Sequence, residues 1–195
     1  MTKSVARLVL SLFYRIETVI QGVLPEEGPV ILLPKHQYWV DIPLVGLVFE
    51  TPLYFVAKKE LFRLPLVRQY LSSGGGIPVD RERTIRTLRS FKRLLALLRA
   101  KEWIVIFPEG TYFRDRVGAG KSRLLQMILR HQAQLNRPIP FVPVGIRYGE
   151  KIGWRKRVEI SVGAPLFAEK ESEAIFLTER VMEEISRLCQ LPKGR

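Results

Sequence analysis

The sequence has little cysteine and little histidine. Cys189 is the only cysteine, so no disulfide can form within the chain, and a reducing compartment is permitted. No histidine lies near Cys189 in the sequence, so we do not expect it to be a nucleophile. His36 and His131 are the only histidines, which argues against a zinc site built from several imidazoles. We therefore expect no metal site.

The sequence also lacks a run of about 18 apolar residues, the length that a membrane-spanning helix needs. It comes closest at the N-terminus, where apolar residues recur at helical spacing from Val5 to Val23 and arginines lie along the opposite stripe. The segment is too charged for a signal peptide. We expect an amphipathic helix in residues 1–24. Two interpretations stay open: it packs on the protein's own core, or it lies in a membrane interface.

Acidic residues are too few to balance the basic ones. The 195 residues include 32 Lys and Arg against 19 Asp and Glu, which gives a net charge of +13. This excess predicts an anionic partner: nucleic acid, anionic lipid or a phosphorylated ligand. Residues 81–101 alone hold eight basic residues and one acid. We expect them to form a helix that faces an anionic surface.

The composition is that of a globular protein, with 47% apolar and 26% charged residues, and short apolar runs alternate with helical patterns. The expected strands are residues 30–33, 53–57, 77–79, 103–107, 140–146 and 158–162. The expected helices are residues 42–50, 64–72, 83–101, 121–135 and 178–188. This order predicts one α/β domain in residues 25–195, with a mostly parallel sheet flanked by helices.

The first candidate site follows the strand expected at residues 30–33. His36 and Asp41 stand between this strand and a helix, and the sites of α/β sheets form at the carboxyl ends of strands. The two side chains can meet if His36 lies on the loop and Asp41 caps the helix. Such a pair makes a general base, because the carboxylate fixes the tautomer of the imidazole. The alternative is a surface histidine beside an ordinary helix cap.

Two further groups follow expected strands. The strand at residues 103–107 is followed by a polar turn that contains Glu109, Gly110 and Thr111. This turn either binds a polar acceptor or is an ordinary solvated turn. Arg81 follows the strand at residues 77–79. Its guanidinium either grips a phosphate or belongs to a solvated basic face.

A fourth group, Val142, Pro143 and Val144, lies in the strand expected at residues 140–146. By themselves these residues carry no chemistry. Pro140 and Pro143 predict an edge or irregular strand, because proline cannot donate a ladder hydrogen bond.

In this order the four groups resemble the motifs of the glycerophospholipid acyltransferases, most closely those acting on 1-acylglycerol-3-phosphate (lysophosphatidate). That family is characterised by an H-x4-D motif, a G-x-I-x-V-D-R-like block, F-P-E-G-T and a V-P-V-like block. Here the blocks stand at residues 36–41, 75–81, 107–111 and 142–144. The resemblance spans residues 34–146, more than half of the chain.

The resemblance implies that a thioester donor, acyl-CoA or acyl-carrier protein, acylates lysophosphatidate to phosphatidate with no further cofactor. His36 would deprotonate the free hydroxyl and Asp41 would orient the imidazole. Arg81 would hold the acceptor phosphate, and residues 109–111 would bind the glycerol-phosphate end. Residues 142–144 would lie on the donor side. The resemblance also implies an α/β fold with an N-terminal membrane element, hence peripheral or monotopic attachment, which we expect at an anionic membrane surface on the cytoplasmic face.

The motifs depart from the family pattern at two positions, and the second bears on the acceptor. Lys35 precedes the histidine where the family often has asparagine, and Tyr112 stands where arginine usually follows F-P-E-G-T. The acceptor head group is therefore open, and Arg114 is the candidate replacement for the missing arginine.

Three alternatives remain. The acceptor could be another lysolipid or an amino-acid lipid, or the chain could be a lipid-binding module without activity. The basic charge also suits a nucleic-acid-binding module. We expect no nucleic acid, because the aromatic residues lie in apolar runs and do not alternate with the basic ones.

Overall fold

The computed structural model describes residues 3–58, 75–79, 85–135 and 137–194. Its seven-stranded sheet has the order β1-β7-β6-β2-β5-β3-β4, and only β6 and β7 pair antiparallel. The strands are β1 (Tyr14–Ile20), β2 (Val30–Pro34), β3 (Leu53–Lys58), β4 (Ile77–Val79), β5 (Trp103–Ile106), β6 (Phe141–Ile152) and β7 (Arg155–Val162). The predicted mostly parallel sheet is confirmed.

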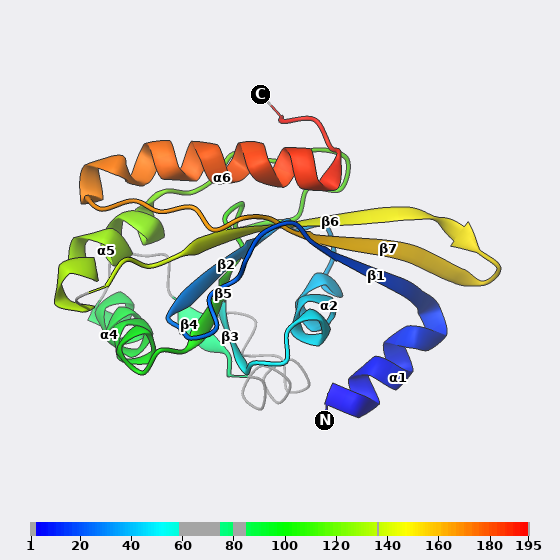
Figure 1. Ribbon diagram of the computed structural model, residues 1–195, viewed down its shortest axis with the longest axis horizontal. Coiled ribbons are helices and arrows are strands. Elements are labelled where there is room, and N and C mark those ends of the chain that lie inside the picture. Colours follow the sequence, from blue (N-terminus) through cyan, green and yellow to red (C-terminus); the bar gives the residue numbers. More distant parts are fainter. Residues whose placement is uncertain (1–2, 59–74, 80–84, 136, 195) are drawn as a thin grey trace.

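Helices cover both faces of this sheet (Figure 1). The α-helices are α1 (Lys3–Phe13), α2 (Asp41–Val48), α4 (Ile85–Arg99), α5 (Arg123–Gln132) and α6 (Ala174–Cys189). Short 3-10 turns stand at Ala133–Leu135 and Glu171–Glu173. The side chains of α4, α5 and α6 share one core with Ile31 and Leu33, and those of α1 and α2 share the other with Val30 and Leu32. β2 is a continuous apolar run because both of its faces are buried.

The N-terminal helix is shorter than predicted. α1 ends at Phe13, and Tyr14–Ile20 forms β1, which pairs parallel with β7 at the edge of the sheet. Four of the seven residues of β1 are β-branched, which favours a strand, and Arg157 of β7 donates hydrogen bonds to Glu17. The prediction of one helix over residues 1–24 is therefore wrong beyond Phe13. In the part of the chain that the structure describes, no helix is long and apolar enough to span a membrane.

The strand with two prolines is interior, so the prediction of an edge strand is wrong. The other predicted alternative, an irregular strand, agrees with the shift in the β6–β7 register between Tyr148 and Lys151. β6 lies between β7 and β2. Its ladder with β7 begins at Val144 opposite Val162, so Pro143 stands just before the ladder and gives up no hydrogen bond there. The Pro143 carbonyl accepts the backbone N–H of Gly163 at 2.9 Å. Pro140 precedes the strand altogether, which is why neither proline interrupts the sheet.

The other expected elements are present within a few residues of their expected bounds. The helix expected at residues 64–72 lies outside the described residues, as does Arg81.

The close packing of α6 on β6 generates a stability prediction. A Cβ added at Gly145 would lie 2.7 Å from the backbone carbon of Leu188 and 2.8 Å from the nitrogen of Cys189. Gly145→Ala should therefore lower the free energy of unfolding by about 1–3 kcal/mol, measured by urea denaturation. Gly149→Ala is the matched control on the same strand, since its Cβ would make only ordinary contacts with Arg157. Equal stability of the two variants would contradict the packing described here.

Candidate active site

Two loops leave the carboxyl edge of the sheet side by side and form the candidate site. β2 and β5 are parallel neighbours, so the loop that carries His36 and the loop that carries Glu109 emerge at the same edge. Aromatic rings enclose the imidazole. The Phe107 ring stacks on it with centroids 4.0 Å apart, and the Tyr112 ring lies 4.3 Å away.

His36 and Asp41 are paired, as their spacing predicted. Nδ1 of His36 lies 3.1 Å from Oδ2 of Asp41. Asp41 is the first residue of α2, and its carboxylate turns back to accept the backbone N–H of Gln37 at 2.6 Å and of Tyr38 at 2.7 Å. The expectation that Asp41 caps α2 is wrong, because Val40 holds the cap position and the loop uses the carboxylate. The loop thus fixes the carboxylate for the imidazole.

This pair has the arrangement of a general base. The Asp41 carboxylate accepts hydrogen bonds from several donors, so Nδ1–H of His36 donates to it and Nε2 keeps its lone pair. The His36 side chain is 11% exposed and that of Asp41 is fully buried, so the imidazole is the accessible member. A buried carboxylate of this kind stabilises the imidazolium that forms when Nε2 takes a proton.

A third residue, Tyr148 of β6, holds Asp41 in place, and sequence reasoning missed it. Its hydroxyl donates a 2.5 Å hydrogen bond to Oδ1 of Asp41. Burial, with the Asp41 carboxylate nearby, raises the pKa of Tyr148 far above its usual range, so the phenol stays a donor. The two-residue alternation of a strand places Tyr148 on the same face as Val144 and Ile146. That alternation is the signal that could have found it.

A buried ion pair joins the two loops. The Nζ of Lys35 lies 2.9 Å and 3.0 Å from the two carboxylate oxygens of Glu109, and both side chains are fully buried. Nζ also donates to the carbonyls of His36 at 3.0 Å and Phe113 at 2.7 Å. Glu109 in turn accepts the backbone N–H of His36 at 2.8 Å and of Gly118 at 2.7 Å. The pair therefore holds His36 by both its carbonyl and its N–H.

The remaining predicted site residues take different positions. Glu109 makes these internal hydrogen bonds, so its contact with an acceptor stays a prediction. Gly110 has a φ of +66°, which lets the loop turn, and Thr111 is exposed. Residues 142–144 are buried inside the sheet, and their role on the donor side stays a prediction. Arg81 lies outside the described residues.

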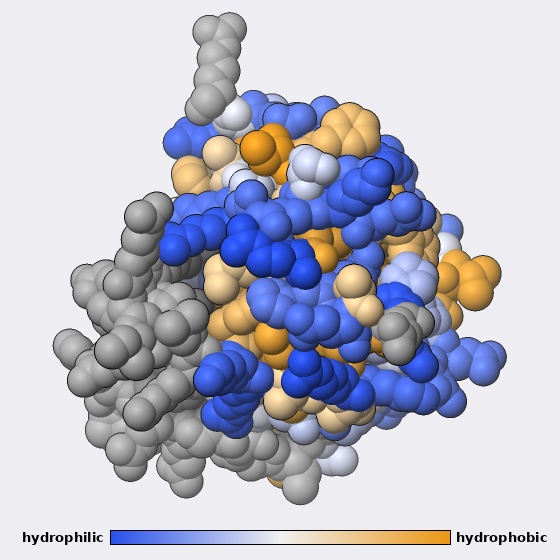
Figure 2. All heavy atoms as spheres, turned by 90° about the vertical axis from the view of Figure 1, so that its left-hand side faces the viewer, coloured by the Kyte–Doolittle hydropathy of each residue, from blue (hydrophilic) through white to orange (hydrophobic). Residues whose placement is uncertain are grey.

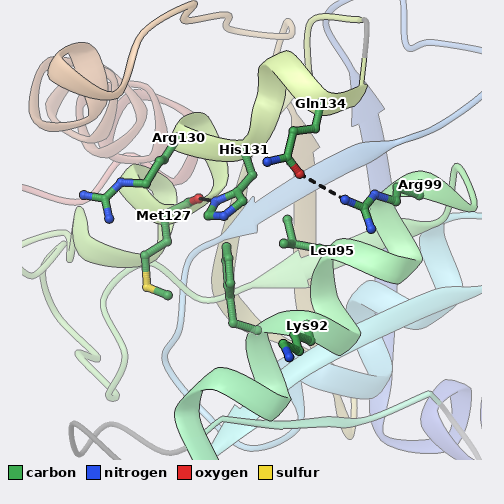
Figure 3. Close-up of a pocket in the computed structure, with 8 residues that line it drawn as sticks. Lys92, Leu95, Arg99, Met127, Arg130, His131 and Gln134 are labelled. Carbon is green, nitrogen blue, oxygen red and sulfur yellow. Dashed lines mark hydrogen bonds between the residues drawn. The ribbon is translucent and has the colours of Figure 1, made fainter. Parts of the chain in front are cut away.

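A separate hollow of about 580 Å³ lies between α4 and α5. Its apolar lining comes from Phe91, Leu95 and Met127, and its basic rim includes Lys92, Arg99 and Arg130 (Figure 3). Three of the residues that line it already have partners: Arg99 donates to Gln134 at 3.0 Å, His131 donates through Nδ1 to the Met127 carbonyl at 2.9 Å, and Nε of Arg130 donates to Glu171 at 2.7 Å. The hollow contains neither His36 nor Asp41. It lies on the side of the sheet that α4, α5 and α6 cover.

Comparison with known proteins identifies a family and several similar enzymes. A family model described as Acyltransferase matches residues 15–147. The chain is 27% identical over 199 residues to a 1-acyl-sn-glycerol-3-phosphate acyltransferase of Bacillus subtilis (strain 168), covering 95% of this chain and 96% of that protein. It is 32% identical over 106 residues to a lyso-ornithine lipid O-acyltransferase of Brucella abortus (strain 2308), covering 54% of this chain and 38% of that protein.

A solved structure has the same fold. The crystal structure of the 1-acyl-sn-glycerophosphate acyltransferase PlsC from Thermotoga maritima superposes with a TM-score of 0.66 at 21% identity, covering 99% of this chain and 80% of that one.

The buried ion pair generates a second stability prediction. Lys35→Met should lower the free energy of unfolding by about 3–5 kcal/mol, because it leaves a buried carboxylate without a cation. The double variant Lys35→Met/Glu109→Gln should be more stable than Lys35→Met alone. Lys101→Met is the control, since Lys101 pairs with Glu27 at 2.9 Å on the surface and should change stability little. Urea unfolding measures all three, and a Lys35→Met protein as stable as the control would refute the prediction.

Proposed function

We propose that this chain, which belongs to the acyltransferase family, transfers an acyl group from a thioester donor to the free hydroxyl of lysophosphatidate, giving phosphatidate. The His36–Asp41 pair at the end of β2 is the observation that carries the proposal. It supplies a base whose imidazole keeps a small exposed fraction at the edge of a parallel sheet, in the H-x4-D spacing of the family. The similarity to the Bacillus enzyme extends along nearly the whole chain and supports the same acceptor.

The geometry supports direct transfer through one tetrahedral intermediate. Nε2 of His36 takes the proton of the acceptor hydroxyl while its oxygen attacks the thioester carbonyl. The intermediate collapses by breaking the carbon–sulfur bond, and the imidazolium returns the proton to the leaving thiolate. Asp41 stabilises the imidazolium throughout, and Tyr148 and the loop amides hold its carboxylate. No acyl-enzyme forms. Cys189 is buried, and burial raises the pKa of its thiol, so it is no competing nucleophile.

Cations beside the site suit an acceptor that carries a phosphate. The guanidinium of Arg114 lies 5.2 Å from the centre of the Tyr38 ring, and Nζ of Lys156 lies 5.9 Å from it. Both charges therefore flank the loop that holds Asp41. Arg114 stands near the position where the family usually has arginine. We assign it, together with Arg81, to the acceptor phosphate.

The second candidate function differs only in its acceptor, which would be a lysolipid with another head group. The similarity to a lyso-ornithine lipid O-acyltransferase favours it, and so does Tyr112 in the place of the usual arginine. The chemistry at His36 would be the same. An assay with labelled acyl-CoA and both acceptors, following thiol release, distinguishes them, and acyl-carrier protein can replace CoA in the same assay.

An acceptor with a fatty chain resides in a bilayer, so we propose peripheral or monotopic attachment at an anionic membrane surface on the cytoplasmic face. The outer face of α1 supplies exposed apolar side chains, including Leu8 and Phe13. α4, which the sequence suggested as a source of charge, packs on the opposite face of the sheet, so its exposed Lys92 and Arg93 are not on the side that α1 presents. Figure 2 shows mainly hydrophilic side chains on the face where α4 and α5 lie.

His36→Ala should lower kcat/KM by about 10²–10⁴-fold in a protein that stays folded, because it removes the base. Asp41→Asn should also lose much of the activity. His131→Ala is the matched control, since His131 lies on α5 outside the site, and it should keep near-normal turnover. Thiol release measures the rates and circular dichroism checks the fold. Near-normal turnover of folded His36→Ala would exclude this mechanism.

Arg81→Ala should raise the KM for the acceptor and leave the KM for the donor nearly unchanged, because the proposed partner of Arg81 is a phosphate that only the acceptor presents to it. Arg114→Ala should behave in the same way. Initial rates with each substrate varied in turn separate the two constants. If a substitution changes both KM values equally, the replaced residue does not act by binding the acceptor phosphate.

A further inference from the structure

The hairpin of β6 and β7 ends in an exposed apolar tip. Ile152 pairs with Arg155, and the turn between them is Gly153-Trp154, with a φ of +64° at Gly153. The side chain of Trp154 is 81% exposed and Ile152 is exposed beside it. The turn itself needs only a glycine at its first position. The turn does not require the tryptophan, whose ring is left exposed at a protruding tip.

This tip adjoins the outer face of α1. The indole N–H of Trp154 donates to the carbonyl of Leu12 at 3.1 Å, which ties the hairpin to the last turn of the helix. Leu8, Leu12 and Phe13 are exposed on that helix, and Leu8 is 66% exposed. In Figure 1 the yellow end of the hairpin and the blue helix lie at the same end of the molecule. We call these exposed side chains together, Leu8, Leu12, Phe13, Ile152 and Trp154, the apolar end.

The hairpin that carries the tip is basic. Residues 147–157 hold five basic residues and one acid, a net charge of +4, and of the basic residues Arg157 is paired with Glu17. Apolar and aromatic side chains on a basic hairpin match the headgroup region of an anionic bilayer, where the rings meet the acyl boundary and the cations meet phosphates. A second copy of this chain fits less well, because it would bring the same positive charge to the contact.

We propose that the β6–β7 hairpin tip is a second membrane contact, which together with the outer face of α1 binds an anionic phospholipid surface. The inference rests on the proposed function and deepens it, because it says how the site meets its lipid. β6 also carries Tyr148, whose hydroxyl holds Asp41, four residues before Ile152 and about 13 Å along a strand. A lipid surface at the tip therefore orients the edge of the sheet that holds the His36–Asp41 pair.

The test uses the full chain and co-sedimentation with vesicles of phosphatidylglycerol and phosphatidylcholine. Ile152→Ser/Trp154→Ser should weaken vesicle binding by at least about tenfold. Ile175→Ser/Phe176→Ser is the matched control, since these two exposed apolar side chains stand on α6, away from the tip, and it should bind as the intact chain does. Lys151→Gln/Arg155→Gln should weaken binding to these vesicles but not to pure phosphatidylcholine. Lipid with brominated acyl chains should quench the tryptophan fluorescence of the intact chain more than that of the Trp154→Phe variant.

Activity separates this inference from the proposed function. The tip variant should keep its rate on a short-chain, water-soluble lysophosphatidate and lose rate on a long-chain acceptor in vesicles. If the intact chain acylates neither acceptor, the proposed function fails, and vesicle binding alone decides the membrane contact. Equal sedimentation of the tip variant and the intact chain would overturn the inference. So would a change from dimer to monomer in the variant with vesicle binding unaltered, since the tip would then face a second copy.

Discussion

The contact between Lys35 and Glu109 joins the two loops on which the candidate active site is built. Taking both charges out of water costs several kcal/mol for each ion, about as much as their attraction returns. The pair persists because the ammonium also contacts two carbonyls and the carboxylate also accepts two backbone N–H groups. Parallel pairing of β2 and β5 brings the loops close, and this ion pair sets their relative position. A general base works only when its ring is held in place, so the buried charge serves the chemistry at His36.

Local signals were sufficient for much of the structure. β2 and β5 are continuous apolar runs bounded by loop residues, and strands buried on both faces have that pattern. The His36–Asp41 pair was predictable because a histidine after such a strand and an aspartate at the start of the next helix are separated only by a short loop. In these cases the residues that decide the structure lie within about ten positions of one another.

Partners far apart in the sequence were not predictable. Lys35 has no local sign that its partner stands 74 residues later, and Tyr148 lies 107 residues from Asp41. β1 shows the same limit. The apolar spacing of residues 5–23 fits a helix, and only the edge of β7, more than 130 residues away, turns Tyr14–Ile20 into a strand. A single sequence contains the β-branched residues that favour this pairing but not the neighbour that decides it.

The pairing of β1 with β7 also constrains how the chain folds during its synthesis. Tyr14 pairs with Lys156 and Ile20 with Val162, so β1 is synthesised more than 130 residues before the strand with which it pairs. Until then residues 14–20 are an unpaired, β-branched segment, the kind that other chains capture during synthesis. Closing so long a loop also slows folding, because its entropy must be lost before the sheet edge compensates. Early contact between α1 and a membrane surface would keep residues 14–20 away from other chains until β7 has been translated.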